Sequence, residues 1–133
     1  MAFHVEAEAE INTIVRGANE YGTHSKCVAL KRITSTNGVR DYIDVQYSTS
    51  GCSSYVGRIG GNQRLKLTSS CIQEYGSIIH EFLHAVGFYH QQSTFDRDDW
   101  VTIMWENIEE GHEHNFNKYD DSSGPHRCWF PYD

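Results

Sequence analysis

The sequence predicts an α+β fold, because two helical hydrophobic patterns enclose a run of strand patterns. Residues 5–21 and 71–87 carry apolar side chains at helical spacing, and short alternating segments lie between them. The chain has 133 residues, of which 38% are hydrophobic and 13% aromatic, which is a globular composition for a single domain. We therefore expect one domain, in which two helices back a twisted mixed sheet.

The first helix is predicted over residues 5–21. Its glutamates occupy much of the polar face, and Gly22 is a suitable stop. The apolar positions of this helix are Val5, Ile11, Ile14, Val15 and Ala18.

Three strand segments follow. Residues 27–33 are rich in β-forming side chains, and residues 42–47 and 63–67 alternate between apolar and polar. Asn37-Gly38 predicts a turn, because this pair tolerates positive φ. The Gly- and Ser-rich residues 48–61 are expected to form a loop, and they lack the Gly-Lys-Ser/Thr ending of a phosphate-binding loop.

The most regular helical pattern covers residues 71–87. Ser70 followed by Gln73 fits a capping box, and Gly87 suits the left-handed position after a helix end. Gly76 costs about 1 kcal/mol relative to alanine inside a helix, so we expect a close packing contact there. A short helix is predicted near 106–117. The core-facing stripe is Ile72, Tyr75, Ile79, Phe82, Leu83 and Val86.

The charge pattern argues against two classes of partner. There are 11 basic and 18 acidic residues, giving a net charge of −7, and no dense Lys/Arg cluster. Such a chain is a poor nucleic-acid binder. No apolar run approaches the roughly 18 residues that span a bilayer. Four cysteines indicate an oxidising compartment, and the acidic N-terminus lacks the apolar region of a signal peptide, which fits a piece of a larger precursor.

The second helix contains the chemical signal, His80-Glu81-Phe82-Leu83-His84. Residues four apart lie one above the other on a helix, so His80 and His84 can hold one metal ion. After the turn at Gly87, His90 can return as a third nitrogen ligand. Three imidazoles with one open position describe a catalytic zinc site, and Glu81 is placed to act as general base and then acid.

The alternative is a helix with ordinary hydrogen-bonded histidines, and the full spacing from His80 to His90 disfavours it. A second pair, His112 and His114, also alternates, but without further ligands a solvated face is the better interpretation. The acidic clusters lack the regular spacing of a calcium loop.

Beyond this motif, the chain resembles the astacin family of metzincin zinc metalloendopeptidases. The resemblance runs from about residue 11 to 132. It is carried by the metzincin pattern at 80–90 and by Gly51-Cys52-Ser53-Ser54-Tyr55-Val56-Gly57-Arg58, Gly60-Gly61-Asn62-Gln63, Phe88-Tyr89-His90, Asp96-Arg97-Asp98, Val101-Thr102-Ile103 and Trp105-Glu106-Asn107-Ile108.

The resemblance implies a zincin-like fold and a secreted, monomeric enzyme that hydrolyses internal bonds of polypeptide substrates. Residues 1–133 would be a single partial peptidase domain, consisting of the N-terminal subdomain without its first strand and of a truncated C-terminal subdomain without its Met-turn. The implied site has one Zn²⁺ on His80, His84 and His90, with Glu81 as the catalytic residue.

The resemblance also implies contacts around the cleft. Residues 62–67 correspond to an edge strand on which Gln63, Arg64 and Leu65 bind substrate backbone, although Arg64 and Lys66 are also typical of a solvated, protected edge. Cys52 is implied to pair with Cys71, and the partners of Cys27 and Cys128 stay open.

Some positions depart from the family pattern. Gln91 stands where the family has a glutamate that meets the mature N-terminus, and neither Met1 nor Met104 fits the Met-turn. These departures support a rival interpretation, in which the chain is a catalytically impaired or truncated astacin-like protein that binds zinc and peptides.

Overall fold

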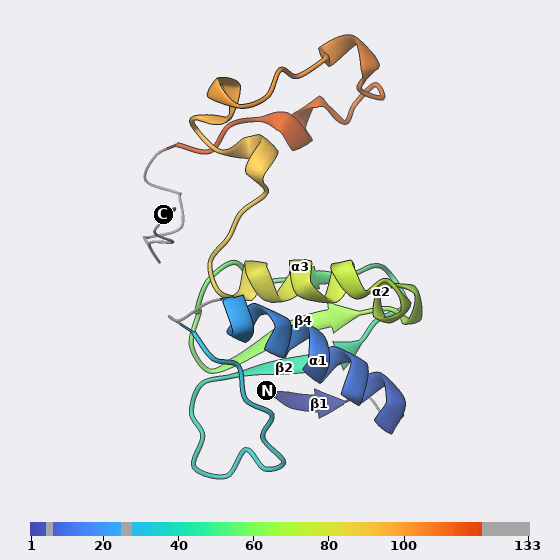
Figure 1. Ribbon diagram of the computed structural model, residues 1–133, viewed down its shortest axis with the longest axis vertical. Coiled ribbons are helices and arrows are strands. Elements are labelled where there is room, and N and C mark those ends of the chain that lie inside the picture. Colours follow the sequence, from blue (N-terminus) through green and yellow to red (C-terminus); the bar gives the residue numbers. More distant parts are fainter. Residues whose placement is uncertain (5–6, 25–27, 121–133) are drawn as a thin grey trace.

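The two principal helices lie on one face of a four-stranded sheet (Figure 1). This computed structural model describes residues 1–4, 7–24 and 28–120. Strands β1, β2 and β4 run parallel to one another, and β3 is antiparallel to β4, so the sheet is mixed as predicted. In spatial order the strands are β1 (Ala2–His4), β2 (Tyr42–Tyr47), β4 (Asn62–Leu67) and β3 (Ser53–Ser54).

The two edges of the sheet differ from the sequence prediction. Residues 28–33 form no strand, and the place beside β2 is taken by β1, from a segment whose polar composition gave no strand pattern. The prediction that 62–67 is the edge strand is wrong, because β4 pairs with β2 along its whole length and with β3 at Leu65 and Lys66. The outermost strand beside β4 is therefore β3, inside the segment expected to be a loop.

The predicted second helix is two helices. Helix α2 (Ser69–Gln73) and helix α3 (Tyr75–Ala85) meet at Glu74, whose φ of −89° and ψ of 89° are not helical. Thr68 caps α2 by accepting a hydrogen bond from the Cys71 N–H at 3.2 Å, a role expected of Ser70. Because the break shifts the helical phase, Ile78 and not Ile79 is fully buried.

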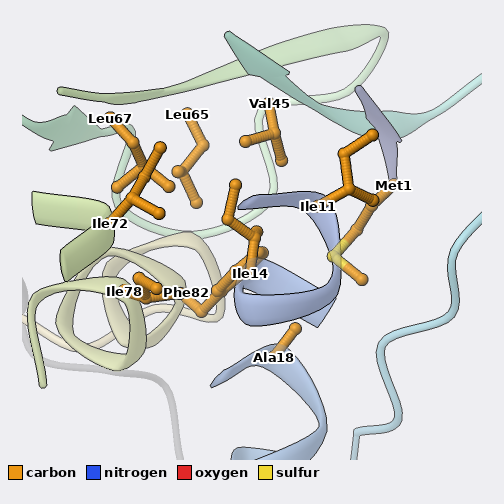
Figure 2. Packing of buried hydrophobic residues seen from close by; sticks show 10 residues of the cluster. All are labelled: Met1, Ile11, Ile14, Ala18, Val45, Leu65, Leu67, Ile72, Ile78 and Phe82. Atoms are coloured by element: carbon orange, nitrogen blue, oxygen red, sulfur yellow. The ribbon is translucent and has the colours of Figure 1, made fainter. Parts of the chain in front are cut away.

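The core lies between the sheet and the helices, as Figure 2 shows. Helix α1 (Glu8–His24) begins after the predicted start and continues past Gly22. Strand β4 alternates between buried and exposed side chains, the pattern expected of a strand with one covered face. In β2 the neighbouring residues Asp44 and Val45 are both buried, so burial does not alternate along that strand. The side chains with no exposed surface are Ile14 and Ala18 from α1, Val45, Leu65 and Leu67 from the strands, and Ile78 and Phe82 from α3.

The close approach of α1 to α3 depends on Gly17. A methyl group built there would lie 2.7 Å from Ile78 Cγ2, which is shorter than any normal carbon contact. Gly76, where the sequence predicted a close contact, is exposed, and a methyl group built on it would meet no heavy atom within 4 Å. The helix–helix contact therefore depends on the glycine of α1.

We expect Gly17→Ala to lower the free energy of unfolding by about 1–3 kcal/mol, the usual cost of overpacking a core. Gly76→Ala is the matched control, since it replaces a helical glycine in open space and should raise stability by about 0.4–1 kcal/mol. Urea denaturation of both variants measures the two effects. Equal stability of Gly17→Ala and the wild type would contradict the close packing of α1 on α3.

Beyond α3 the chain leaves the sheet and forms a separate lobe, drawn in orange in Figure 1. The single helix predicted near 106–117 is absent. The lobe after α3 contains short 3₁₀ helices instead. They are Gln91–Ser93, Arg97–Asp99, Trp105–Asn107 and Glu113–Phe116. No helix within the described residues is long and apolar enough to cross a bilayer.

Candidate metal centre and active site

Helix α3 divides its side chains between the core and a cluster of histidines. Ile78, Phe82 and Ala85 are buried, while His80 is exposed and His84 half-buried. Because the two histidines are four residues apart, they project from the same side of the helix. The buried residues thus hold α3 in place against the core, while the two imidazole rings project from another side of the helix.

The third histidine returns to the other two after the helix has ended. Gly87 has a φ of 113°, a conformation that residues with a Cβ rarely adopt. The Gly87 N–H donates to the His84 carbonyl at 2.9 Å, and the Phe88 N–H donates to the Leu83 carbonyl at 3.0 Å. These two bonds are those of a Schellman helix end, and Gly87 occupies the predicted position.

The Nε2 atoms of the three histidines converge. The distances are 2.9 Å between His80 and His84, 3.2 Å between His84 and His90, and 3.3 Å between His90 and His80. Across residues 1–4, 7–24 and 28–120, this is the one group of three metal-ligating side chains close enough to share an ion. Nitrogen ligands at about 2.0–2.1 Å from a tetrahedral zinc ion would lie about 3.3–3.4 Å apart. The distances of 3.2 and 3.3 Å agree with this spacing, and the 2.9 Å between His80 and His84 is shorter.

The hydrogen bonding of His84 also fits a metal. Its Nδ1 lies 2.7 Å from the Phe88 carbonyl, which can only accept, so Nδ1 carries the proton. In the neutral ring Nε2 then holds a lone pair directed at the cluster, the arrangement that metal-binding histidines use. Three lone pairs facing one point repel one another unless a cation lies between them.

The surroundings favour neutral rings. Desolvation, followed by the charges of His84 and His90, lowers the pKa of His80, and desolvation followed by His84 lowers the pKa of His90. A lowered pKa keeps an imidazole neutral at physiological pH, and the neutral form is the metal ligand.

Glu81 lies beside the cluster and is nearly enclosed. It is 6% exposed, and among the described residues nothing donates a hydrogen bond to its Oε2. Burial raises the pKa of Glu81, and the charge of His84 lowers it in part. Glu81 and His80 line a pocket with Gly76, Ser77 and the disulfide, and the Glu81 Oε2 atom is buried.

The disulfide Cys52–Cys71 is present and borders this pocket. It links the segment of β3 to α2, and the Thr68 N–H is directed at the Cys52 sulfur at 3.3 Å. The expected pairing of these two cysteines is therefore found in the structure, whereas Cys27 and Cys128 lie outside the described residues.

The three residues expected to bind substrate have different environments. Leu65 has no exposed surface and packs in the core, and Gln63 is 4% exposed and bonded to the turn at 57–59. Arg64 is exposed and lines a pocket with Lys66, Ser53, Ser54 and Tyr55. Of the three, Arg64 alone directs its side chain to solvent at the β3 edge.

The lobe after the histidines is fastened by the buried guanidinium of Arg97. Arg97 is 6% exposed, donates to the Gln92 carbonyl at 2.7 Å and to the Phe116 carbonyl, and pairs with Asp98. The Tyr119 ring packs on Tyr89 with centroids 4.6 Å apart. The lobe is thereby tied to the segment that carries His90.

We expect Arg97→Lys to destabilise this lobe by about 1–3 kcal/mol, because an ammonium group cannot reproduce the planar fork of donors. Limited proteolysis should show faster cleavage between residues 92 and 118. Arg64→Lys is the control, since Arg64 is an exposed arginine outside this lobe. If Arg97→Lys were cleaved at the wild-type rate, the guanidinium group of Arg97 would not be needed to stabilise the lobe.

Comparison with known proteins agrees with this geometry. The family model for astacin, a peptidase family, matches residues 2–133. The chain belongs to the astacin family. It is 46% identical over 108 residues to zinc metalloproteinase nas-15 of Caenorhabditis elegans, a match that covers 80% of this chain and 18% of that protein. It is 49% identical over 87 residues to rat meprin A subunit beta, covering 65% of this chain and 12% of that protein.

The solved structures give the same result. The hatching enzyme high choriolytic enzyme 1 of medaka superposes with a TM-score of 0.72 at 33% identity, covering 90% of this astacin-family chain and 59% of that one. Myroilysin superposes with a TM-score of 0.62 at 16% identity, covering 92% and 68%, which shows a shared fold. The chain thus spans less than a fifth of nas-15 and of meprin A subunit beta.

Two hydrogen-bonding arrangements near the histidine cluster were not anticipated. The Phe88 carbonyl acts through the backbone, so no side-chain pattern could indicate it. Gln63 was expected to bind substrate, and its bonds to the turn at 57–59 were not foreseen, although its alternation with Leu65 and Leu67 placed it on the buried face of β4. A polar residue at an apolar position of that pattern was the available signal for an internal hydrogen-bonding role.

Proposed function

We propose that this astacin-family chain carries the catalytic centre of a zinc metalloendopeptidase that hydrolyses internal peptide bonds of proteins. His80, His84 and His90 hold the zinc ion, and Glu81 is the general base and acid. The observation that carries the proposal is the convergence of three Nε2 atoms within 3.3 Å, beside the buried residue Glu81, which lines a pocket together with His80.

When bound, the zinc ion supplies Lewis acidity toward the scissile carbonyl and toward water. Glu81 accepts a proton from the attacking water at a carboxylate oxygen, while the water oxygen bonds to the carbonyl carbon. Glu81 then returns this proton to the leaving amine as the C–N bond breaks, so the carboxylate is regenerated. The enclosure of Glu81 strengthens these interactions by keeping bulk water away from its oxygens.

The substrate side of the site is proposed to be the edge formed by β3. An extended peptide can add to an outer strand through backbone hydrogen bonds. Gln63 and Leu65 are buried and would support this edge from inside the fold. Arg64, on β4, would extend its side chain toward a peptide bound at the β3 edge. The Cys52–Cys71 disulfide supports a protein that functions outside the reducing cytosol, and we infer that it is secreted.

The test is zinc content together with digestion of casein. We expect one zinc ion per chain, cleavage that stops on addition of a strong chelator, and recovery on adding zinc. Zinc binding without cleavage would instead support the rival function, a catalytically impaired zinc- and peptide-binding relative. Absence of zinc binding would overturn both.

A further inference from the structure

A buried carboxamide connects the sheet to the end of the histidine helix. Gln63 Nε2 donates to the Gly57 carbonyl at 2.9 Å, and Gln63 Oε1 accepts from the Ile59 N–H at 3.1 Å. Both ends of one side chain are therefore bonded to the backbone of one turn. Gln63 belongs to β4, which pairs with β2 along its whole length, so the turn at 57–59 is held against the sheet.

The same turn contacts α3 at the residue that carries a histidine ligand. The Gly57 N–H donates to the His84 carbonyl at 2.8 Å, and this carbonyl also accepts from the Gly87 N–H at 2.9 Å. A methyl group built on Gly57, whose φ is 76°, would lie 4.0 Å from Gly87 Cα. The turn thus packs directly on the helix end that sets the direction of the chain toward His90.

We propose that Gln63 is a positioning residue for the metal centre, acting through the turn 57–59 on the backbone of His84. The ring of His84 is oriented by Phe88 and its backbone by Gly57, so both of its supports lie at the helix end that Gln63 secures. This inference rests on the proposed zinc site. It gives Gln63 a role in ligand geometry, where the sequence had suggested contact with substrate.

The test uses the full chain and Co²⁺ alone, whose visible absorption reports the geometry of its ligands. Gln63→Met keeps the length of the side chain and its burial but removes both hydrogen bonds. We expect an altered cobalt spectrum and about 10- to 100-fold weaker Co²⁺ binding, the range for groups that orient metal ligands. Gln46→Met is the matched control, because Gln46 is a glutamine of the adjacent strand that bonds to Asp44 and not to the turn.

A second measurement needs no variant. Because coupling between two sites is reciprocal, zinc bound to the histidines should slow hydrogen exchange of the amides at 57–59 by about tenfold or more. Wild-type protein that binds no Co²⁺ would overturn the zinc site itself. A normal spectrum and affinity in Gln63→Met, or exchange at 57–59 that zinc leaves unchanged, would overturn the role of Gln63 while leaving the zinc site intact.

Discussion

Replacing Glu81 by glutamine should reduce the rate of peptide hydrolysis by about 10²–10⁴-fold, the usual contribution of a general base. Glutamine has nearly the same shape as glutamate but cannot accept the proton at neutral pH. The proposed zinc ligands are the three histidines, so zinc content should stay at the wild-type level. Initial rates on a quenched fluorescent peptide, with metal analysis of the same samples, measure both quantities.

Glu74→Gln is a matched control for this substitution. Glu74 is an exposed glutamate at the start of the same helix, and its carboxylate bonds to Ser77. It should retain wild-type rates. If Glu81→Gln cleaved as fast as Glu74→Gln, Glu81 would not be the proton acceptor.

Replacing His84 by alanine should weaken zinc binding by at least about 100-fold. Zinc binds to sites in small domains with a total free energy of about 10–16 kcal/mol. The loss of one of three histidine ligands should therefore remove several kcal/mol of binding free energy. The Nε2 atom of His84 lies within 3.2 Å of both other Nε2 atoms, and its removal leaves two imidazoles in place of three to hold the ion. Competition with a zinc-binding dye gives the affinity.

His114→Ala is the comparison for His84→Ala. His114 is an exposed histidine that bonds to the Gly111 carbonyl and does not belong to the metal group of the described residues. Its removal should leave zinc affinity unchanged. If His84→Ala and His114→Ala bound zinc with equal affinity, His84 would not be a zinc ligand.

The parts of the site that depend on local spacing could be predicted from the sequence. His80, Glu81 and His84 follow from one helical turn, and the position of Gly87 follows from the rules for helix ends. Strands over 42–47 and 63–67 were also predicted, because apolar and polar residues alternate in both segments. The alternation matches the burial of β4, whereas in β2 both Asp44 and Val45 are buried.

The parts that depend on pairing between distant segments could not be predicted. β1 and β3 are three and two residues long, too short for a periodic pattern, and their partners decide that they are strands. Residues 28–33 have strand-forming side chains but are not a strand, although the Met1 amino group donates to the Lys31 carbonyl at 2.8 Å and the Ile33 N–H donates to the Met1 carbonyl at 2.9 Å. The contact that requires a glycine involves Gly17 and Ile78, from different helices, so Gly76 had been the more visible candidate.

Helix α3 serves the hydrophobic interior and the histidine cluster within the same eleven residues. A change that shifts the backbone of α3 in its packing also moves His80 and His84, because these side chains are attached to the same helix as Ile78 and Phe82. We therefore expect substitutions at Phe82 to change the positions of the two imidazole rings as well as the free energy of unfolding.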